Sequence, residues 1–384
     1  MILTLLAILG ASIWLILLIL PWRPWSTKEF LDGTGRTKGD LSDLTVLIPA
    51  RNEAKEIERT LRSIEAQGEN LRILVIDDQS SDGTGKIAES LNIKGLSVIS
   101  GKKLEAGWAG KMWALEQGRK HLQTPYVLLL DADIELENGI LSSLLTKLKH
   151  GGFDFVSLMA SLQMKSFWEK LLAPAYIHFF KLLYPFSLAN SSLKFFAAAA
   201  GGCIITKTQV LEKIGGFSAI KGALIDDCSL AKVVKQNGYR TWIGLTHSVI
   251  SHRDYSQLHE IWNLVARFAF TYLRYSALLL ILCSVLLISC FWALPISLIF
   301  QELSPEIKIY LALGLLSMFF VYLPCVRFYR LSWAWVLLKP LVGSLYLLMT
   351  WSSALRYWKG QRSEWKGRVY DKNLEVTEDL KKAS

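Results

Sequence analysis

The amino-acid sequence predicts an α/β domain, built on a mostly parallel sheet with helices on both faces, between membrane segments at the two ends of the chain. Short apolar runs typical of strands alternate with amphipathic helical stretches from about Leu44 to Gly244, as in proteins whose sheets are covered by helices on both sides. Long apolar runs are concentrated near the termini instead. They account for much of the hydrophobic content of 52% and the mean hydropathy of +0.30.

The N-terminal segment 1–22 is expected to be a transmembrane anchor. Met1–Leu20 carries no charge and no proline, and it is long enough to cross the hydrocarbon core of a bilayer. A cleavable signal peptide would have basic residues before the apolar run and small residues at a cleavage site after it, whereas Pro21–Trp25 follows directly. The positive-inside rule places the end of this segment in the cytosol, because it is followed by Arg23, Lys28, Arg36 and Lys38.

The C-terminal region 276–355 contains three further apolar runs, Ala277–Phe300, Ile309–Val326 and Trp333–Ala354. Lys339-Pro340 interrupts the third run, which favours a re-entrant or interfacial element. Two crossings then keep the basic tail 356–384 in the cytosol. We therefore expect an integral protein of a bacterial cytoplasmic membrane with a cytosolic catalytic domain, joined to the membrane region by an interfacial helix at 256–275.

The soluble domain is expected at 44–255, and its elements follow from runs of apolar residues bounded by glycine and polar turns. The expected strands are Leu44–Pro49, Leu71–Ile76, Leu96–Ser100, Tyr126–Leu130 and Cys203–Thr206. The expected helices are Glu53–Gln67, a helix that ends at Leu91, Trp113–His121, Ile140–His150 and Leu230–Gln236. In open sheets of this kind, ligands bind at the carboxyl ends of the strands.

Polar motifs stand at those strand ends. Ala50-Arg-Asn-Glu53 follows the first strand, Asp77-Asp78 follows the second, and Asp131-Ala-Asp133 follows the fourth. Two acids at positions i and i+2 form a weak signal by themselves, but five apolar strand residues precede Asp131. A carboxylate pair at a strand end suits a hydrated divalent cation that carries a diphosphate.

Several other motifs have both an ordinary and a functional interpretation. The segment Asp77–Gly83 suits a turn and helix cap, and it also suits an aspartate that accepts a hydrogen bond from a uracil imide. Gly107-Trp-Ala-Gly-Lys111 lacks Walker spacing, but Lys111 is long enough to reach a donor phosphate. One acid at Asp226-Asp227 would cap the following helix. The second favours Asp227 as a general base.

The remaining candidates are small residues and histidines. Ala197–Gly202 is either a close-packing element or a wall of an acceptor pocket, with Gly201, Gly202 and Asp226 as contacts. His247 and His252 are either structural or a third metal ligand. The net charge of +10 lies largely beside the apolar runs, where anionic headgroups explain it. No dense Lys/Arg run with interleaved aromatics occurs, so we expect no nucleic-acid partner. The five cysteines have no zinc-like spacing.

Taken together, four ordered motifs resemble those of the family 2 glycosyltransferases, which share a GT-A nucleotide-sugar fold. The motifs are Leu47–Glu53, Val75–Thr84, Asp131–Asp133 and Asp226–Leu230, and the resemblance extends from about Thr45 to Tyr275. Narrower features are similar to the hopanoid- or hopene-associated branch of HpnB type. These are Gly107–Lys111, Ala197–Cys203, Gly222–Asp227, Gly244–Ser248 and Leu273–Ser276.

The resemblance implies a role for each matching residue. Asp77 or Asp78 would read the base and Glu53 would contact the ribose, while Asp131 and Asp133 would surround Mg²⁺ or Mn²⁺. Asp227 would deprotonate the acceptor hydroxyl for an inverting attack. The full nucleotide-sugar set implied in this way is Pro49, Ala50, Arg51, Glu53, Asp77, Asp78, Lys111, Asp131 and Ala132.

One departure from the family pattern bears on the reaction. Processive synthases carry Gln-x-x-Arg-Trp, whereas this chain has Leu264-Val-Ala-Arg-Phe268. The resemblance therefore implies transfer of a single sugar, from a nucleotide-sugar that is expected to carry UDP, to a hopanoid or polyprenoid lipid. The alternatives are another lipid carrier, a short processive synthase, or a non-catalytic scaffold that binds nucleotide-sugars.

Overall fold

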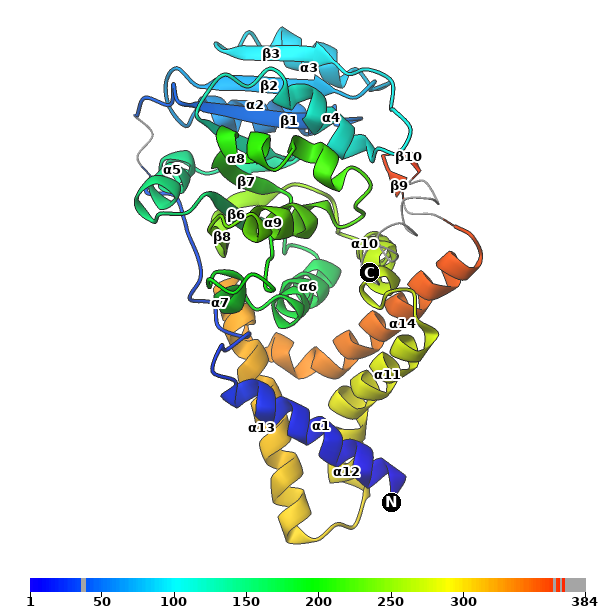
Figure 1. Cartoon of the computed structure of the whole chain (residues 1–384). Helices are drawn as coiled ribbons and strands as arrows, with labels where there is room; N and C mark the ends of the chain where they lie inside the picture. The colour runs from blue at the N-terminus through cyan, green and yellow to red at the C-terminus, as the bar shows by residue number, and fades with distance from the viewer. Residues whose placement is uncertain (36–38, 362–363, 367, 370–384) are drawn as a thin grey trace. The chain divides into compact units, whose positions relative to one another are not determined.

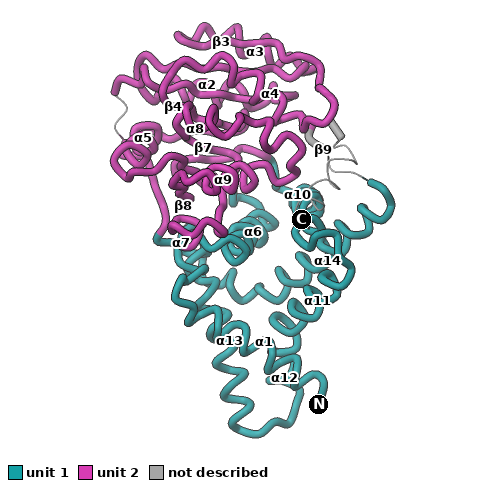
Figure 2. The backbone as a smooth tube through the Cα atoms, viewed as in Figure 1, with its two compact units in different colours: residues 1–28, 163–187, 254–362 teal, residues 29–162, 188–253, 363–384 magenta. Residues whose placement is uncertain are grey.

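The computed structural model describes residues 1–35, 39–361, 364–366 and 368–369. The chain forms two compact units, coloured separately in Figure 2. The sheet unit comprises Glu29–Leu162, Leu188–Arg253 and Ser363–Ser384, and the helical unit comprises Met1–Lys28, Gln163–Ser187 and Asp254–Arg362. The helical unit thus includes a segment, Gln163–Ser187, that lies within the expected soluble domain 44–255.

The sheet unit is built on one mixed sheet of eight strands, in the order β3-β2-β1-β4-β7-β6-β8-β5 (Figure 1). The strands are β1 (Leu44–Ala50), β2 (Arg72–Asp77), β3 (Leu96–Ser100), β4 (Tyr126–Leu130), β5 (Ile134–Leu136), β6 (Phe155–Leu162), β7 (Cys203–Lys207) and β8 (Thr241–Ser251). A separate pair consists of β9 (Glu364–Trp365) and β10 (Arg368–Val369). The GT-A-like α/β fold that the sequence predicts is confirmed.

Strand direction is less uniform than the sequence suggests. Strands β3, β2, β1 and β4 are parallel to one another, and β6 is parallel to β8. Strand β7 is antiparallel to both β4 and β6, and β5 is antiparallel to β8. The apolar pattern of a strand is the same in either direction, so it could not reveal these reversals.

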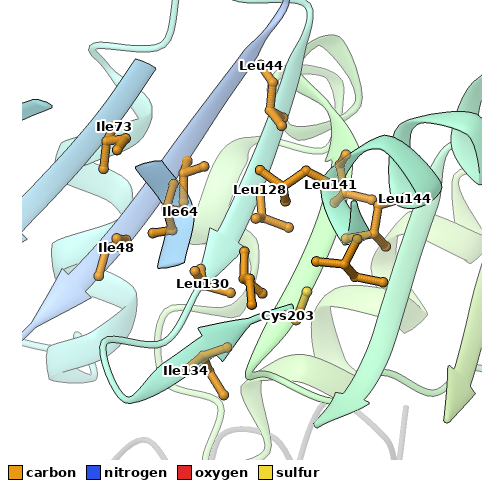
Figure 3. Packing of buried hydrophobic residues seen from close by; sticks show 14 of the residues in the cluster. Leu44, Ile48, Ile64, Ile73, Leu128, Leu130, Ile134, Leu141, Leu144 and Cys203 are labelled. Atoms are coloured by element: carbon orange, nitrogen blue, oxygen red, sulfur yellow. The ribbon is translucent and has the colours of Figure 1, made fainter. Parts of the chain in front are cut away.

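Helices cover both faces of the sheet because side chains alternate between the faces along each strand. On β1, Val46 and Ile48 join one core cluster, and Leu47 joins the other. The first cluster contains α2 (Ile57–Glu65), α3 (Thr84–Ser90) and α5 (Ile140–His150), and part of it is shown in Figure 3. The second contains α4 (Gly110–Arg119), α8 (Thr208–Lys213), η1 (Gly216–Ile220) and α9 (Asp226–Gln236).

Helix α2 begins later than the sequence suggests because the loop after β1 is bonded to the loop after β2. The amide of Glu53 donates to the Thr84 hydroxyl at 2.8 Å, and the amide of Ala54 donates to the Asp82 carboxylate at 3.0 Å. These bonds satisfy amides that a helix beginning at Glu53 would leave without partners in its first turn. The loop Arg51–Glu56 is therefore fixed beside the ends of both strands.

The helical unit contains most of the long apolar helices. Its elements are α1 (Ile2–Ile19), α6 (Phe167–Leu183), α10 (Leu258–Tyr272), α11 (Ala277–Ile288), η2 (Ser289–Ala293), α12 (Leu294–Phe300), α13 (Pro305–Phe328), η3 (Trp333–Leu338) and α14 (Lys339–Trp358), and the short α7 (Phe186–Ala189) follows α6. Within the described residues, four segments are long and apolar enough to cross a membrane: Ile2–Ile19, Ala277–Phe300, Pro305–Phe328 and Trp333–Trp358.

The segment Trp333–Trp358 is continuous in length although it contains Lys339-Pro340. Pro340 stands in the first turn of α14, where a missing amide hydrogen costs nothing and the fixed φ suits a helix. The interruption is therefore a change from the 3₁₀ segment η3 to the α-helix α14. That this run does not span the membrane stays a prediction.

Gln67 joins three elements of the sheet unit through its buried side-chain amide. Its Nε2 donates to the carbonyls of Ser63, Leu136 and Glu137 at 3.1, 3.2 and 3.1 Å, and its Oε1 accepts from the amide of Leu141 at 3.4 Å. Gln67→Leu would leave these buried groups unpaired. We expect it to lower the free energy of unfolding by about 1–3 kcal/mol.

The test is the melting temperature of the purified full-length variant in detergent. The matched control is Gln123→Leu, because Gln123 is exposed and its side chain bonds only the surface residue Arg72 among the contacts of the structure. Equal melting temperatures for the two variants would show that the Gln67 bonds do not contribute to stability.

Candidate active site

Strand β7 places the glycine loop that precedes it beside Asp131, one of the carboxylates predicted to bind a metal ion. Because β7 is antiparallel to β4, its first residue Cys203 pairs with Leu130, the last residue of β4. The amide of Asp131 then donates to the carbonyl of Gly202 at 3.1 Å. Gly201 and Gly202 therefore lie beside Asp131, at the edge of the sheet where β1, β2 and β4 end.

Lys111, in the first turn of α4, links this edge to α9. Its Nζ lies 2.6 Å from Oδ1 of Asp131 and 3.9 Å from Oδ2 of Asp226, and it donates to the carbonyl of Gly201 at 3.4 Å. Burial disfavours the charged ammonium, but the carboxylates of Asp131 and Asp226 outweigh it and raise the pKa of Lys111. The side chain is therefore a fixed positive charge among several acids.

Asp227 is held differently from its neighbours. Its Oδ2 accepts from the amide of Gly201 at 2.9 Å, and its Oδ1 accepts from the amide of Cys228 at 2.7 Å. Burial and the negative charge of Asp226 raise its pKa to about 7, against the opposing effect of these bonds and of Lys111. A carboxylate that titrates near neutral pH is suited to accept a proton from a substrate.

A small cavity of about 20 Å³ joins these groups. It is lined by Pro49, Lys111, Asp131, Gly201, Asp226 and Asp227 together with apolar residues of the sheet and α9. The structure thus brings together predicted donor, acceptor and catalytic residues from five separate parts of the chain.

Asp133 and Asp131 form a pair that suits a divalent cation. Burial, and then the charge of Asp131, raise the pKa of Asp133, whose Oδ2 accepts from the Ser251 hydroxyl at 3.3 Å. No cluster of three or more His, Cys, Asp or Glu side chains with metal-binding geometry occurs among the described residues. Two carboxylates fit Mg²⁺ or Mn²⁺ that also binds substrate phosphates, because water and phosphate oxygens supply most of the other ligands of such ions.

The two candidate histidines differ in position. The backbone amide of His252 donates to the carbonyl of Asp133 at 2.8 Å, while its ring Nε2 lies 2.5 Å from Oε2 of Glu135. His247 lies on β8 within an irregularity of its pairing with β6, and its Nδ1 lies 2.8 Å from Oδ2 of Asp32. His252 is therefore bonded directly to a residue of the carboxylate pair.

The aspartates after β2 are engaged within the protein. Asp77 accepts from the amide of Ser80 at 3.0 Å, as expected for a turn. Asp78 is fully buried, with its carboxylate 3.9 Å from the guanidinium of Arg51, and its amide donates to the carbonyl of Ala50. Arg51 also donates to the carbonyl of Gln79 at 3.2 Å.

Ala132 contributes through its backbone rather than through its side chain. The residue is buried, and its carbonyl accepts from the hydroxyl of Thr60 on α2 at 2.7 Å. This bond ties the segment between Asp131 and Asp133 to the helix that follows the first loop.

Two basic residues at this edge were not identified from the sequence. Nζ of Lys366 lies 3.0 Å from Oε1 of Glu53, and its carbonyl accepts from Nε of Arg51 at 3.0 Å. Burial raises the pKa of Glu53 to about 6, and the charges of Lys366 and Arg253 oppose this shift. Lys366 belongs to a basic tail that suits lipid headgroups equally well. The composition of this tail therefore did not indicate that Lys366 contacts the loop after β1.

Comparison with known proteins agrees with this geometry. The family model for glycosyl transferase family 2 matches residues 45–215, so this part of the chain is similar to that family. A 4,4'-diaponeurosporenoate glycosyltransferase of Staphylococcus haemolyticus is 34% identical over 95 residues, which are 25% of each chain. The corresponding protein of Staphylococcus aureus (strain USA300) is 36% identical over 91 residues, 24% of each chain. The match thus spans about a quarter of the length of these relatives.

The same architecture occurs in a solved structure, a mannosyltransferase from Pyrobaculum calidifontis in complex with GDP-mannose and Mn²⁺. The likeness covers 92% of this chain and 99% of that chain, with a TM-score of 0.54 and 20% sequence identity. At this identity the likeness establishes a shared fold. The membership of the hopanoid-associated branch stays a prediction.

The raised pKa of Asp227 predicts how the stability of the folded protein changes with pH. The folded protein retains a proton on Asp227 up to about pH 7, whereas the unfolded chain releases it near pH 4. Stability is therefore lost as pH rises through this interval and stays low above it. Asp227→Asn resembles the protonated form, so we expect it to raise the melting temperature at pH 8 by at least roughly 2–4 °C and by less at pH 5.

Melting should be followed on the full-length protein in detergent with a chelator and without donor. Asp43→Asn is the control, because Asp43 is exposed and pairs only with the surface residue Lys149 among the ion pairs of the structure. A stabilisation by Asp227→Asn of equal size at both pH values would contradict a raised pKa at this position.

Proposed function

We propose that the protein is a membrane-bound, metal-dependent, inverting glycosyltransferase. It moves one sugar from a nucleotide-sugar, with UDP as the expected nucleotide, to a lipid acceptor of hopanoid or polyprenoid type. The observation that carries the proposal is the half-buried carboxylate of Asp227, whose pKa of about 7 suits a base and which lines one cavity with Lys111 and Asp131.

The reaction follows from the proton that Asp227 removes. In the proposed step, Asp227 accepts the proton of the acceptor hydroxyl as the oxygen attacks the anomeric carbon of the donor. The bond from that carbon to the diphosphate oxygen breaks on the opposite side, which inverts the configuration. Gly201 fixes the orientation of Asp227 through its amide, while Gly202 and Asp226 form the adjoining part of the acceptor contact.

The donor side is proposed to use the carboxylate pair and the lysine. Asp131 and Asp133, with His252 or His247 as a further candidate, would hold Mg²⁺ or Mn²⁺. Such an ion offsets the charge that develops on a departing diphosphate. Lys111 supplies a fixed positive charge at 2.6 Å from Asp131, so its ammonium is available to a phosphate oxygen when the carboxylates have another cation.

The nucleotide is proposed to lie along the loops after β1 and β2. Pro49 and Ala50 end β1, and Arg51 and Glu53 belong to the loop that follows it, while Asp77 ends β2 and Asp78 begins the second loop. Arg51 bonds the second loop, so the two loops present one surface. Glu53 is suited to contact a ribose hydroxyl, since its pKa of about 6 leaves it largely ionised at neutral pH.

The lipid acceptor and the cytosolic position of the site rest on other features. The chain carries four segments that are long and apolar enough to span a membrane, counted over the residues that the structure describes. The staphylococcal relatives are named for transfer to 4,4'-diaponeurosporenoate. Both features favour an apolar acceptor, and the basic residues beside the membrane segments favour a site that faces the cytosol.

Three alternative functions would use the same site but would give different products or none. A short processive synthase would make polymer, and another lipid carrier would give a different labelled lipid. A non-catalytic scaffold would bind the nucleotide-sugar without transfer. The pKa of Asp227 favours an enzyme over a scaffold, because binding alone has no need for a base.

Asp227→Asn tests the proposal. Loss of a general base should lower the rate of sugar transfer into a lipid extract by roughly 10²–10⁴-fold, while nucleotide binding is kept. Transfer is measured with membranes that contain the protein and with radiolabelled UDP-glucose, UDP-N-acetylglucosamine or GDP-mannose. The control is Asp43→Asn, which changes an exposed carboxylate of the same unit. Unchanged transfer by Asp227→Asn would refute its role as the base.

A further inference from the structure

The helical unit contains a second, much larger cavity. Its volume is about 430 Å³, and every residue that lines it belongs to the helical unit. The walls come from α1, α6, α10, α11, η2 and α14, with Trp14, Phe179, Phe268, Leu287 and Phe291 among the contributors. Aliphatic and aromatic side chains dominate these walls, which is the lining of a site for an apolar ligand.

Three polar side chains of the walls already have hydrogen-bond partners within the protein. The hydroxyl of Tyr346 donates to the carbonyl of Leu172 at 3.1 Å, and that of Thr350 donates to the carbonyl of Tyr346 at 2.7 Å. Nε1 of Trp14 donates to the carbonyl of Cys290 at 3.0 Å. These donors already have hydrogen-bond partners, so a polar ligand would gain no hydrogen bond from them.

One wall packs against the buried side chain of Lys339. Nζ of Lys339 lies 3.5 Å from the ring centre of Tyr322 and 4.7 Å from that of Phe179, and Lys339 is fully buried. Phe179 also packs against Tyr346, with ring centroids 4.8 Å apart. These packing contacts hold the aromatic side chains in place, so this part of the wall is preformed.

Helix α10 lines this cavity with the residues that replace a family motif. Leu264 and Phe268 contribute to the wall, while the guanidinium of Arg267 lies over the ring of Phe268 at 4.3 Å. In the chain, α10 follows β8, whose end at Ser251 pairs with Ile134 beside Asp133.

The volume sets the size of the occupant. The cavity is roughly three times as large as the ~150 Å³ apolar cavity that accepts a benzene molecule, so it admits on the order of fifteen to twenty carbon atoms. This volume is larger than a few water molecules or a few side-chain groups would occupy. It corresponds to several isoprene units or to a compact polycyclic hydrocarbon.

We propose that this cavity is a binding site for the apolar hydrocarbon of the lipid acceptor, of isoprenoid type. The proposal rests on the proposed function for the identity of the ligand as a substrate. The cavity binds the non-reacting part of the acceptor, and its binding energy contributes to transfer from long-chain acceptors. Acceptors without a long hydrocarbon gain none of this energy.

Direct labelling tests the site without the reaction. The purified full-length protein in lipid nanodiscs is illuminated with a diazirine-bearing C15 isoprenoid alcohol, and the labelled peptides are mapped. We expect label on Leu264, Phe268 and Cys283, displaced by excess unlabelled C15 alcohol. Label that falls mainly on the exposed α11 residues Ile281 and Leu282, without displacement, would overturn the proposal, since these side chains lie outside the cavity lining.

A filled cavity tests the effect on transfer. Cys283→Trp places a large ring into the cavity from α11, where Cys283 is a half-buried part of the lining. We expect kcat/KM for a long-chain isoprenoid acceptor to fall at least about tenfold, with little change for a short-chain, water-soluble analogue. The matched control is Leu282→Trp on the same helix, whose side chain is 50% exposed.

The outcomes separate this proposal from the proposed function. Displaceable label in the cavity with no transfer from any donor would leave the binding site standing and refute the transferase. Equal losses for long and short acceptors in Cys283→Trp, with label unchanged, would show a general structural defect and refute the role of the cavity. A selective loss for the long acceptor, with label lost as well, supports both.

Discussion

The arrangement of the site depends on one partly buried cation, the ammonium of Lys111. Acids at the end of β4 and at the start of α9 approach each other at the edge of the sheet, and like charges in a partly buried site repel strongly. Lys111 offsets this repulsion, since its Nζ lies 2.6 Å from Asp131 and 3.9 Å from Asp226. The glycine loop before β7 then closes on the same group through the carbonyl of Gly201.

This arrangement gives the carboxylates different chemistry. Asp131 faces the ammonium, whereas Asp227 accepts from backbone amides, and desolvation together with the charge of Asp226 raises its pKa to about 7. The carboxylate pair of Asp131 and Asp133 suits a cation that carries a diphosphate, and the carboxylate of Asp227 suits a proton. Both roles therefore follow from burial and from the position of one lysine.

Sequence patterns predicted the strands and the acidic motifs better than their connections. Leu96–Ser100 and Tyr126–Leu130 have the bounds expected of them, because apolar residues between polar turns mark a buried strand in either direction. The reversal of β7, which places Gly201 and Gly202 beside Asp131, depends on pairing between distant segments. The contact of Lys366 with Glu53 likewise joins residues far apart in the chain, and the cavity of the helical unit depends on six packed segments.

Binding of Mn²⁺ at the carboxylate pair, Asp131 and Asp133, is the most direct test of the central claim. The claim is that the acids around Lys111 also bind a metal ion that carries a diphosphate. Binding of Mn²⁺ to the full-length protein can be followed by electron paramagnetic resonance with and without UDP or GDP. We expect tight Mn²⁺ binding only with a nucleoside diphosphate, lost when Asp131 and Asp133 are both changed to Asn and kept in Asp227→Asn. Equal Mn²⁺ binding by the double variant and the unaltered protein would contradict this account.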